Sequence, residues 1–303
     1  MDLPYRAGGG PARALCRISA HVTFPPRDRA DAPRERAEPR EMAALKALAD
    51  EHPELAPAVA LEREIVDGER RLQRRLGTPW LDVSNEDLAA RLGRGERLIE
   101  WAQLGIDWPE FRLRLRQVVD ILRRHDILDA ADAARLHEVG RDPGLPLTVE
   151  RWYDEGANGG PVADTSLADV LGLTVRPFLT RAAEVVQQRV STDAWPRGTC
   201  PMCGARPGFA VVSAPGVRHL VCGRCHGRWL FDARTCPRCL AGDRQRVFSA
   251  HDGLYQVAAC DACKRYLKAI DVKKAGRPLL MSVDTVATLA LDQAITAQGF
   301  EAD

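Results

Sequence analysis

The spacing of the cysteines constrains this chain more than any other feature. Eight of its nine cysteines form four Cys-x-x-Cys pairs within residues 200–263. Two cysteines three positions apart on a tight turn can point both sulfurs at one spot, and two such turns supply the four thiolates of a tetrahedral metal site. The pattern therefore predicts two closed, thiolate-only metal sites. The predicted ligands are Cys200, Cys203, Cys222, Cys225, Cys236, Cys239, Cys260 and Cys263.

The distances between the pairs favour two consecutive sites. Eighteen residues separate the first and second pairs, ten the second and third, and twenty the third and fourth. Each half also opens with Cys-Pro-x-Cys and ends with a pair that basic and aromatic residues follow. Such an internal repeat predicts two tandem ribbons, 200–225 and 236–263. An interleaved arrangement, in which the outer pairs share one metal and the inner pairs another, stays open at this point.

The sequence before the cysteines has the periodicity of helices. Apolar residues recur at helical spacing from residue 41 onward, and Pro57 suits the first turn of a helix. Ser84, with Asp87 three residues later, resembles a capping box. The clearest late helix is predicted at 175–190. Strand patterns are almost absent here, so we expect a helical domain.

Short β-like runs appear only between the cysteine pairs, as in the hairpins of a rubredoxin or a zinc ribbon. Helical spacing returns at Ser282. The predicted fold class is α plus small β: a mainly α-helical N-terminal domain, two tandem rubredoxin- or zinc-ribbon-like metal modules and a C-terminal helix. The predicted boundaries are 1–40 for a flexible arm, 41–195 for the helical domain, 196–232 for the first four-cysteine ribbon, 233–275 for the second and 276–303 for the C-terminal helix.

Composition and charge limit the classes of function. The formal net charge of +1 gives no global basic field that would attract nucleic acid. No apolar run is long enough to span a membrane, and the first twenty-five residues lack the apolar core of a signal peptide. We therefore expect a cytoplasmic protein. In that reducing compartment, clustered cysteines bind metal or take part in redox chemistry and rarely form disulfides.

The ligand number limits the chemistry of the predicted sites. A closed four-thiolate site leaves no coordination position for a substrate, so we do not expect Lewis-acid hydrolysis at these sites. Zinc in such a site is structural, whereas iron can carry one electron, and the spacing does not separate the two metals. Residues 222–226 also match the haem-attachment signature Cys-x-x-Cys-His. Because this pair lies within a thiolate array, we expect His226 at the surface or beside the ligands.

Taken together, residues 200–270 resemble the formate dehydrogenase accessory protein family of the FdhE type. The segments that carry the resemblance are Cys-Pro-Met-Cys-Gly at 200–204, 218–225 followed by Trp229, Cys-Pro-Arg-Cys at 236–239, and the pair Cys260/Cys263 followed by Tyr266-Leu267-Lys268. The preceding helix and the C-terminal stretch are similar more loosely.

The resemblance implies a cytoplasmic, non-catalytic maturation factor that contacts the catalytic subunit of a molybdenum- or tungsten-containing formate dehydrogenase. It also implies that the eight cysteines hold iron in rubredoxin-like sites, with zinc as the alternative metal. Two other hypotheses stay open. One is a nucleic-acid-binding double zinc ribbon, which the basic residues near the cysteines would serve. The other is a general zinc-centre chaperone, although the chain lacks the Cys-x-x-Cys-x-Gly-x-Gly repeats of such proteins.

Overall fold

The computed structural model describes residues 33–77, 83–157, 164–214, 216–250 and 253–302. By their contacts, residues 1–39 and 40–303 are separate units. Residues 1–32 of the expected arm, with Cys16, lie outside the described part. The helices are α1 (Pro33–Glu51), α2 (Ala56–Arg75), α3 (Asn85–Arg94), α4 (Trp108–Arg124), α5 (Ala130–Arg141), α6 (Leu145–Ala157), α7 (Thr165–Gln187), α8 (Val272–Ala275), α9 (Met281–Ala287) and α10 (Leu289–Thr296), with 3-10 turns η1 (Pro53–Leu55) and η2 (Trp101–Leu104).

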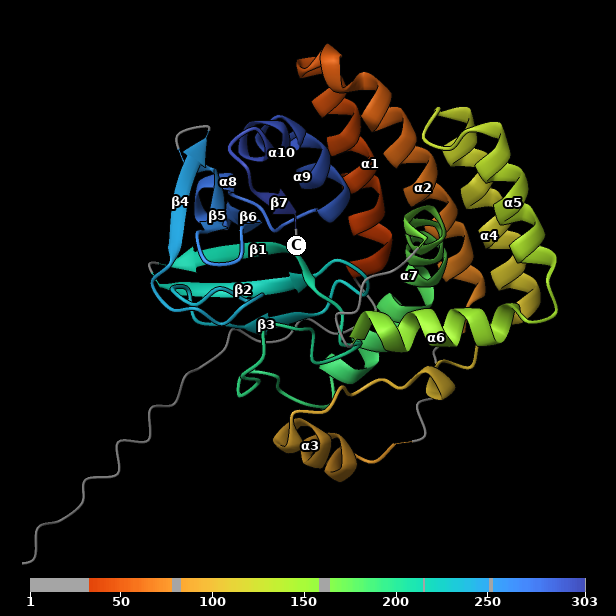
Figure 1. Cartoon of the computed structure of the whole chain (residues 1–303), viewed down its shortest axis with the longest axis horizontal. Helices are drawn as coiled ribbons and strands as arrows, with labels where there is room; N and C mark the ends of the chain where they lie inside the picture. The colour runs from red at the N-terminus through yellow and green to blue at the C-terminus, as the bar shows by residue number, and fades with distance from the viewer. Residues whose placement is uncertain (1–32, 78–82, 158–163, 215, 251–252, 303) are drawn as a thin grey trace, which may run out of the picture. The chain divides into compact units, whose positions relative to one another are not determined.

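Helices α2, α4 and α7 form the centre of the helical part, which confirms the helical N-terminal region predicted from the sequence (Figure 1). Helix α4 packs against α2, α5 and α7. Its buried apolar side chains follow the helical period, because one stripe of the helix faces the core. That stripe consists of Phe111, Leu115, Val118, Val119 and Leu122.

Helix starts follow the capping signals of the sequence. The Ser84 Oγ accepts a hydrogen bond from the Asp87 amide at 3.0 Å and donates one to the Asp87 carboxylate at 2.8 Å. Pro57 lies in the first turn of α2, as predicted. Asp107 and Asp164 cap α4 and α7 in the same way, by accepting from amides three residues later.

Helix α7 begins earlier than the predicted 175–190. It starts at Thr165 and contains Pro177 in its interior. Proline has no amide hydrogen, so the helical hydrogen bond to the Leu173 carbonyl is missing there. Burial of the apolar face, including Val175 and Leu179 at 0 % exposure, keeps the helix continuous across the proline.

Among the described residues, the six strands of the two cysteine regions and β7 near the C-terminal end form one seven-stranded sheet. The strand order is β3-β2-β1-β6-β5-β4, with β7 paired to β6. Each region contributes an antiparallel part, and β1 pairs with β6 in parallel, with Ala210 opposite Ala269. The two ribbons predicted from the sequence therefore share a sheet. The strands are β1 (Pro207–Ala214), β2 (Val217–Cys222), β3 (Arg228–Leu230), β4 (Gln245–Ala250), β5 (Tyr255–Cys260), β6 (Arg265–Asp271) and β7 (Glu301–Ala302).

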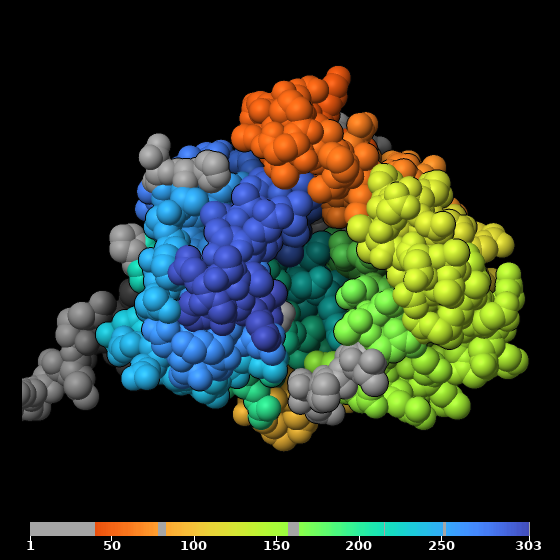
Figure 2. Space-filling model, turned by 45° about the horizontal axis from the view of Figure 1, so that its top comes forward, coloured from red at the N-terminus to blue at the C-terminus, as the bar shows by residue number. Residues whose placement is uncertain are grey.

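The two faces of the sheet pack on different parts of the chain. Phe209 and Ile270 face the C-terminal helices, whereas Ala210 and Ala269 join the main core with the helical layer. Helix α9 also packs on α2, and α1 contributes Leu45 to the same apolar cluster. Figure 2 shows the C-terminal segment in blue and helices α4 and α5 in yellow on either side of a hollow. Within the described residues, no helix is long and apolar enough to cross a lipid bilayer.

Candidate metal centres

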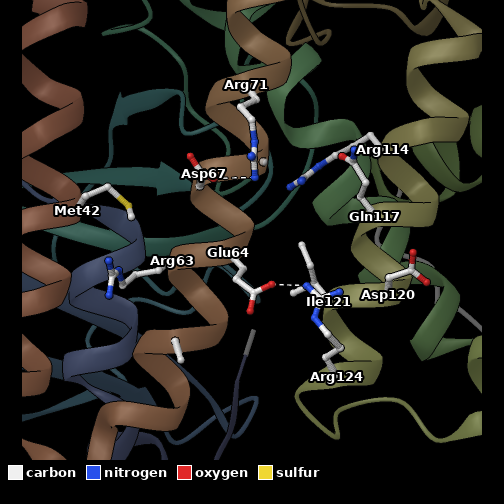
Figure 3. Close-up of a pocket in the computed structure, with 12 residues that line it drawn as sticks. Met42, Arg63, Glu64, Asp67, Arg71, Arg114, Gln117, Asp120, Ile121 and Arg124 are labelled. Atoms are coloured by element: carbon white, nitrogen blue, oxygen red, sulfur yellow. Dashed lines mark hydrogen bonds and ion pairs between the residues drawn. The ribbon is translucent and has the colours of Figure 1, made fainter.

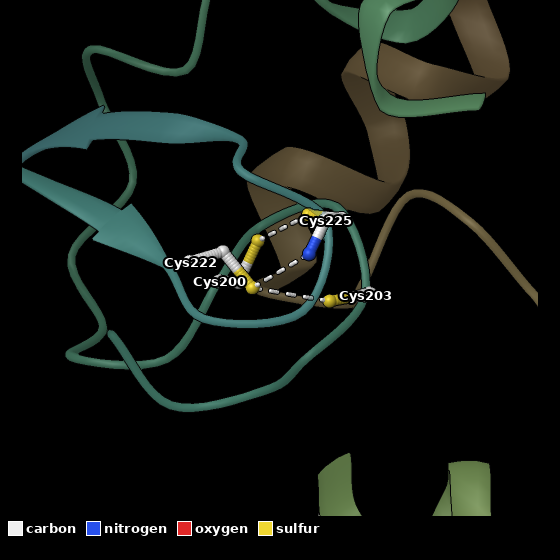
Figure 4. A group of neighbouring side chains, drawn as sticks. All are labelled: Cys200, Cys203, Cys222 and Cys225. Carbon is white, nitrogen blue, oxygen red and sulfur yellow. Dashed lines mark hydrogen bonds between the residues drawn. The ribbon is translucent and has the colours of Figure 1, made fainter. Parts of the chain in front are cut away.

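The first four cysteines come together in one buried cluster (Figure 4). The Sγ atoms of Cys200 and Cys225 are 3.5 Å apart, and those of Cys203 and Cys222 are also 3.5 Å apart. All four sulfurs lie within 4.8 Å of one another. Each side chain is at most 1 % exposed, so the cluster is closed to solvent.

The second four cysteines repeat this arrangement. The Sγ atoms of Cys236 and Cys263 are 3.7 Å apart, as are those of Cys239 and Cys260. Four thiolates at about 2.3 Å from a tetrahedral ion are about 3.8 Å from each other. Both clusters could therefore hold a metal ion. The tandem pairing is confirmed, and the interleaved alternative is wrong.

All four turns have the same backbone geometry. The residue after each pair has a positive φ, and its amide donates to the carbonyl of the first cysteine of that pair. The φ values are 77° for Gly204, 55° for His226, 61° for Leu240 and 59° for Lys264, and the hydrogen bonds measure 2.9, 3.2, 2.9 and 2.9 Å in that order. Sequence pattern alone does not mark these four positions, although a glycine, such as Gly204, is the residue that most readily adopts a positive φ.

Backbone amides also point at the sulfurs of the first cluster. Cys222 Sγ accepts from the amides of Arg224 at 3.3 Å and Cys225 at 3.4 Å, and Cys225 Sγ accepts from Gly227 at 3.4 Å. Burial opposes ionisation of Cys222, but hydrogen bonds from the other cluster thiols and the Cys225 amide bring its pKa well below the ordinary value. Burial raises the pKa of Cys200, and hydrogen bonds within the cluster raise that of Cys225, so in the absence of metal the negative charge is favoured on Cys222. A thiolate is the form of cysteine that binds metal.

The helical part holds the first cluster through main-chain hydrogen bonds. The amides of Leu98 and Ile99 donate to the carbonyls of Pro201 and Met202 at 2.8 and 2.9 Å. The Tyr153 hydroxyl in turn donates to the Ile99 carbonyl at 2.8 Å. The segment between α3 and η2 is thus paired with the first cysteine turn, a contact that no motif in the sequence indicated.

Two basic residues near the clusters have internal roles. The Arg224 guanidinium lies 4.1 Å from the ring centroid of Trp152, which joins the second cysteine turn to α6. Arg218 is buried and donates to the Thr235 carbonyl at 2.7 Å and to Gln245 Oε1 at 3.3 Å, linking the two ribbons. Part of the basic character of this region therefore serves packing.

His226 lies beside the first cluster. It is half-buried, and burial lowers the pKa of its imidazole to about 4, so the ring is neutral at pH 7. Both cysteines of its motif belong to the four-sulfur cluster with Cys200 and Cys203 (Figure 4). This arrangement fits the expected position beside the ligands and does not fit haem attachment.

A separate pocket of about 620 Å³ lies between α2 and α4 (Figure 3). Its lining contains acidic and basic side chains that pair with each other, such as Arg71 with Asp67 at 2.6 Å and Arg124 with Glu64. The second pair connects the two helices. None of the described residues that line this pocket is a cysteine.

Fold and site together define a helical protein with a double four-cysteine ribbon. The chain is similar in sequence to proteins named FdhE homolog and in fold to a solved FdhE protein, which confirms the resemblance seen in the sequence. No protein-family model matches the chain.

The sequence similarity is low over a long alignment with one relative and higher over a shorter alignment with another. An FdhE homolog of Aquifex aeolicus is 23 % identical over 228 residues, which are 73 % of this chain and 77 % of that protein. An FdhE homolog of Shewanella sp. strain MR-4 is 35 % identical over 109 residues, about a third of either chain (34 % and 35 %). The crystal structure of the FdhE protein from Pseudomonas aeruginosa has the same fold, with a TM-score of 0.62 at 19 % identity over 88 % of this chain and 93 % of that one.

Proposed function

We propose that this chain is a non-catalytic, cytoplasmic accessory factor for the assembly of a formate dehydrogenase. In this proposal it binds the catalytic subunit of a molybdenum- or tungsten-dependent enzyme before that subunit becomes active. The observation that carries the proposal is the presence of two complete four-sulfur clusters in a homologue of the FdhE proteins.

The eight clustered cysteines are the proposed metal ligands, with iron as the proposed metal. Sulfur separations of 3.5 to 3.7 Å fit a tetrahedral ion in each cluster. Bound iron would supply one-electron chemistry, and bound zinc a purely structural cross-link. The protein's own part is to keep the sulfurs converged and to donate amide hydrogen bonds to them.

Metal content is tested on protein purified without oxygen. We expect two iron ions per chain by elemental analysis, with the optical bands of iron bound to thiolates. Two zinc ions and no such bands would overturn the choice of iron, whereas fewer than two metal ions of any kind would overturn the ligand assignment.

The client is tested by affinity purification from the native host, grown with formate under low oxygen. We expect the wild-type chain to retain a formate dehydrogenase catalytic subunit. The Cys236→Ser variant should retain less of it, and Cys16→Ser, which changes the cysteine outside the spaced pairs, should match the wild type. Recovery of nucleic acid, or of many unrelated proteins, in place of this subunit would contradict the proposal.

A further inference from the structure

The two clusters share a turn geometry but differ in how they are covered. All four cysteines of the first cluster belong to the main core, which also contains residues of the helical part such as Tyr153 and Val186. In the second cluster, Cys236 and Cys260 are buried, Cys263 is half-buried and Cys239 is exposed. Solvent can therefore reach the second cluster on one side.

The turn that carries the exposed cysteine also has an unfavourable backbone. Leu240 follows Cys239 with φ of 61°, a left-handed conformation that a leucine rarely adopts. Its side chain is 60 % exposed, so packing compensates for little of this strain. The equivalent residue of the first cluster is Gly204, which adopts positive φ without a penalty.

Exposure and strain meet at the same turn. A metal ion bound by the second cluster would hold this turn closed, and opening of the turn would release the strain at Leu240. The first cluster does not combine the two features. Its turn at Cys200–Cys203 is followed by a glycine and is hydrogen-bonded to the segment at Leu98. Its other turn is followed by His226 with φ of 55°, but there the sulfurs are buried.

We propose that the second cluster is a metal-exchange site that opens at Cys239, while the first cluster keeps its metal permanently. This inference rests on the proposed binding of metal by both clusters. The metal would pass from this cluster to a chelating molecule or protein that binds it through oxygen, nitrogen or sulfur donors.

The exchange is a ligand substitution without a redox change. A donor atom of the incoming ligand gives an electron pair to the metal as the bond to Cys239 Sγ breaks. The sulfur leaves with its bonding pair and takes a proton from water, and the metal keeps its oxidation state. The same substitution then takes place at Cys263, which is the next most accessible ligand. The buried pair Cys236 and Cys260 releases the ion last.

The test uses the full-length chain loaded with two zinc ions, treated with excess EDTA and pulse-labelled with iodoacetamide. We expect one zinc ion to leave in a fast phase and the other in a phase at least about tenfold slower, since access controls thiolate reactivity. Mass spectrometry should find label first on Cys239 and Cys263. Cysteines 200, 203, 222 and 225 should stay unlabelled during the fast phase.

The Leu240→Gly variant tests the contribution of strain. We expect its fast phase to be about 3- to 10-fold slower than that of the wild type, with the slow phase unchanged. The matched control is Val247→Ala, which removes exposed apolar surface from the same ribbon outside the cysteine turns and should leave both rates unchanged. A fast phase that Leu240→Gly leaves unchanged or accelerates would overturn the role of strain.

The labelling of the wild-type chain decides the main claim without any variant. Release of both ions in one phase, or early label on the first cluster, would show that the clusters are equivalent and overturn this inference alone. A chain that holds fewer than two zinc ions after loading would instead overturn the proposed metal binding on which it rests.

Discussion

Gly198 lies where the first cysteine turn meets the second ribbon. A Cβ atom at this position would be 1.9 Å from the carbonyl oxygen of Pro237, the residue after Cys236. The opposing atom belongs to the backbone and cannot rotate away, so only glycine lets the two cysteine regions approach this closely.

Gly198→Ala is therefore expected to lower the free energy of unfolding by about 1–3 kcal/mol, because the overlap must be relieved by moving a backbone segment. Chemical denaturation of the metal-loaded chain measures the change. The control is Gly242→Ala in the second ribbon, where a Cβ would meet nothing within 4 Å. Equal stability of the two variants would contradict the close contact.

The carboxyl group of Glu62 on α2 lies in surroundings that disfavour its ionised form. Burial raises the pKa of its carboxyl from 4.5 to about 7, Arg176 opposes the rise, and Glu69 and Glu41 add to it. The folded protein therefore takes up a proton that the unfolded chain does not bind between pH 4.5 and 7. Stability contributed by this group falls as the pH rises through that window, and the penalty is complete above pH 7.

Glu62→Gln removes this penalty. We expect the variant to be more stable than the wild type at pH 8, by up to about 3 kcal/mol, with a gain that shrinks toward pH 5. Denaturation curves at the two pH values measure it. Glu64→Gln is the opposite case on the same helix, because hydrogen bonds from His125 and Arg124 lower the pKa of Glu64. Its substitution should not stabilise the protein at pH 8.

At the scale of elements, a buried carboxylate joins the C-terminal helices to the sheet. Asp284 on α9 is 0 % exposed and accepts from the Tyr255 hydroxyl of β5 at 2.7 Å. It also accepts from Arg277 at 2.6 and 2.9 Å and from the Leu280 amide at 2.8 Å. Of these partners, Tyr255 lies on the sheet, so its hydrogen bond to Asp284 ties α9 to β5.

Asp284→Ala should lower the free energy of unfolding by about 3–5 kcal/mol, since it leaves a guanidinium and a hydroxyl without their acceptor in a buried place. Thermal unfolding and limited proteolysis of the C-terminal segment provide the measurement. Glu301→Ala removes the exposed ion pair with Arg265 and is expected to change stability by less than about 0.5 kcal/mol. Similar losses for both variants would show that Asp284 has no special role.

The elements differ in how far the sequence predicted them. The cysteine clusters could be predicted because ligand spacing is local, and the caps at Ser84 and Pro57 because a cap involves only neighbouring residues. Helix α6 was not predicted as a separate helix within the helical domain, although Leu145, Val149 and Trp152 have helical spacing and are buried. The parallel pairing of β1 with β6 joins residues about sixty positions apart, and no local pattern encodes such a contact.

At the scale of the whole molecule, the two clusters stabilise different amounts of structure. The first cluster is part of the core that also holds α4, α6 and α7, whereas no cysteine of the second belongs to a hydrophobic cluster of the described residues. Metal binding contributes directly to folding at sites of this kind.

Cys203→Ser should therefore lower the melting temperature by about 10 °C or more and loosen both the helical part and the sheet. Cys239→Ser should lower it by less than about 5 °C, with loosening confined to residues near the second cluster. Hydrogen exchange followed by mass spectrometry locates the change in each variant. If Cys239→Ser loosens the helical part as much as Cys203→Ser does, the two clusters stabilise the same amount of structure and this prediction is wrong.

The parallel pairing of β1 with β6 matters for how the chain is made. Residues 210–212 pair with residues 269–271, which leave the ribosome much later. Until then β1 has an open, apolar edge that includes Val211 and Val212, and such edges recruit other strands. A nascent chain that stops after the first ribbon is thus prone to self-association, and completion of the second ribbon ends that exposure.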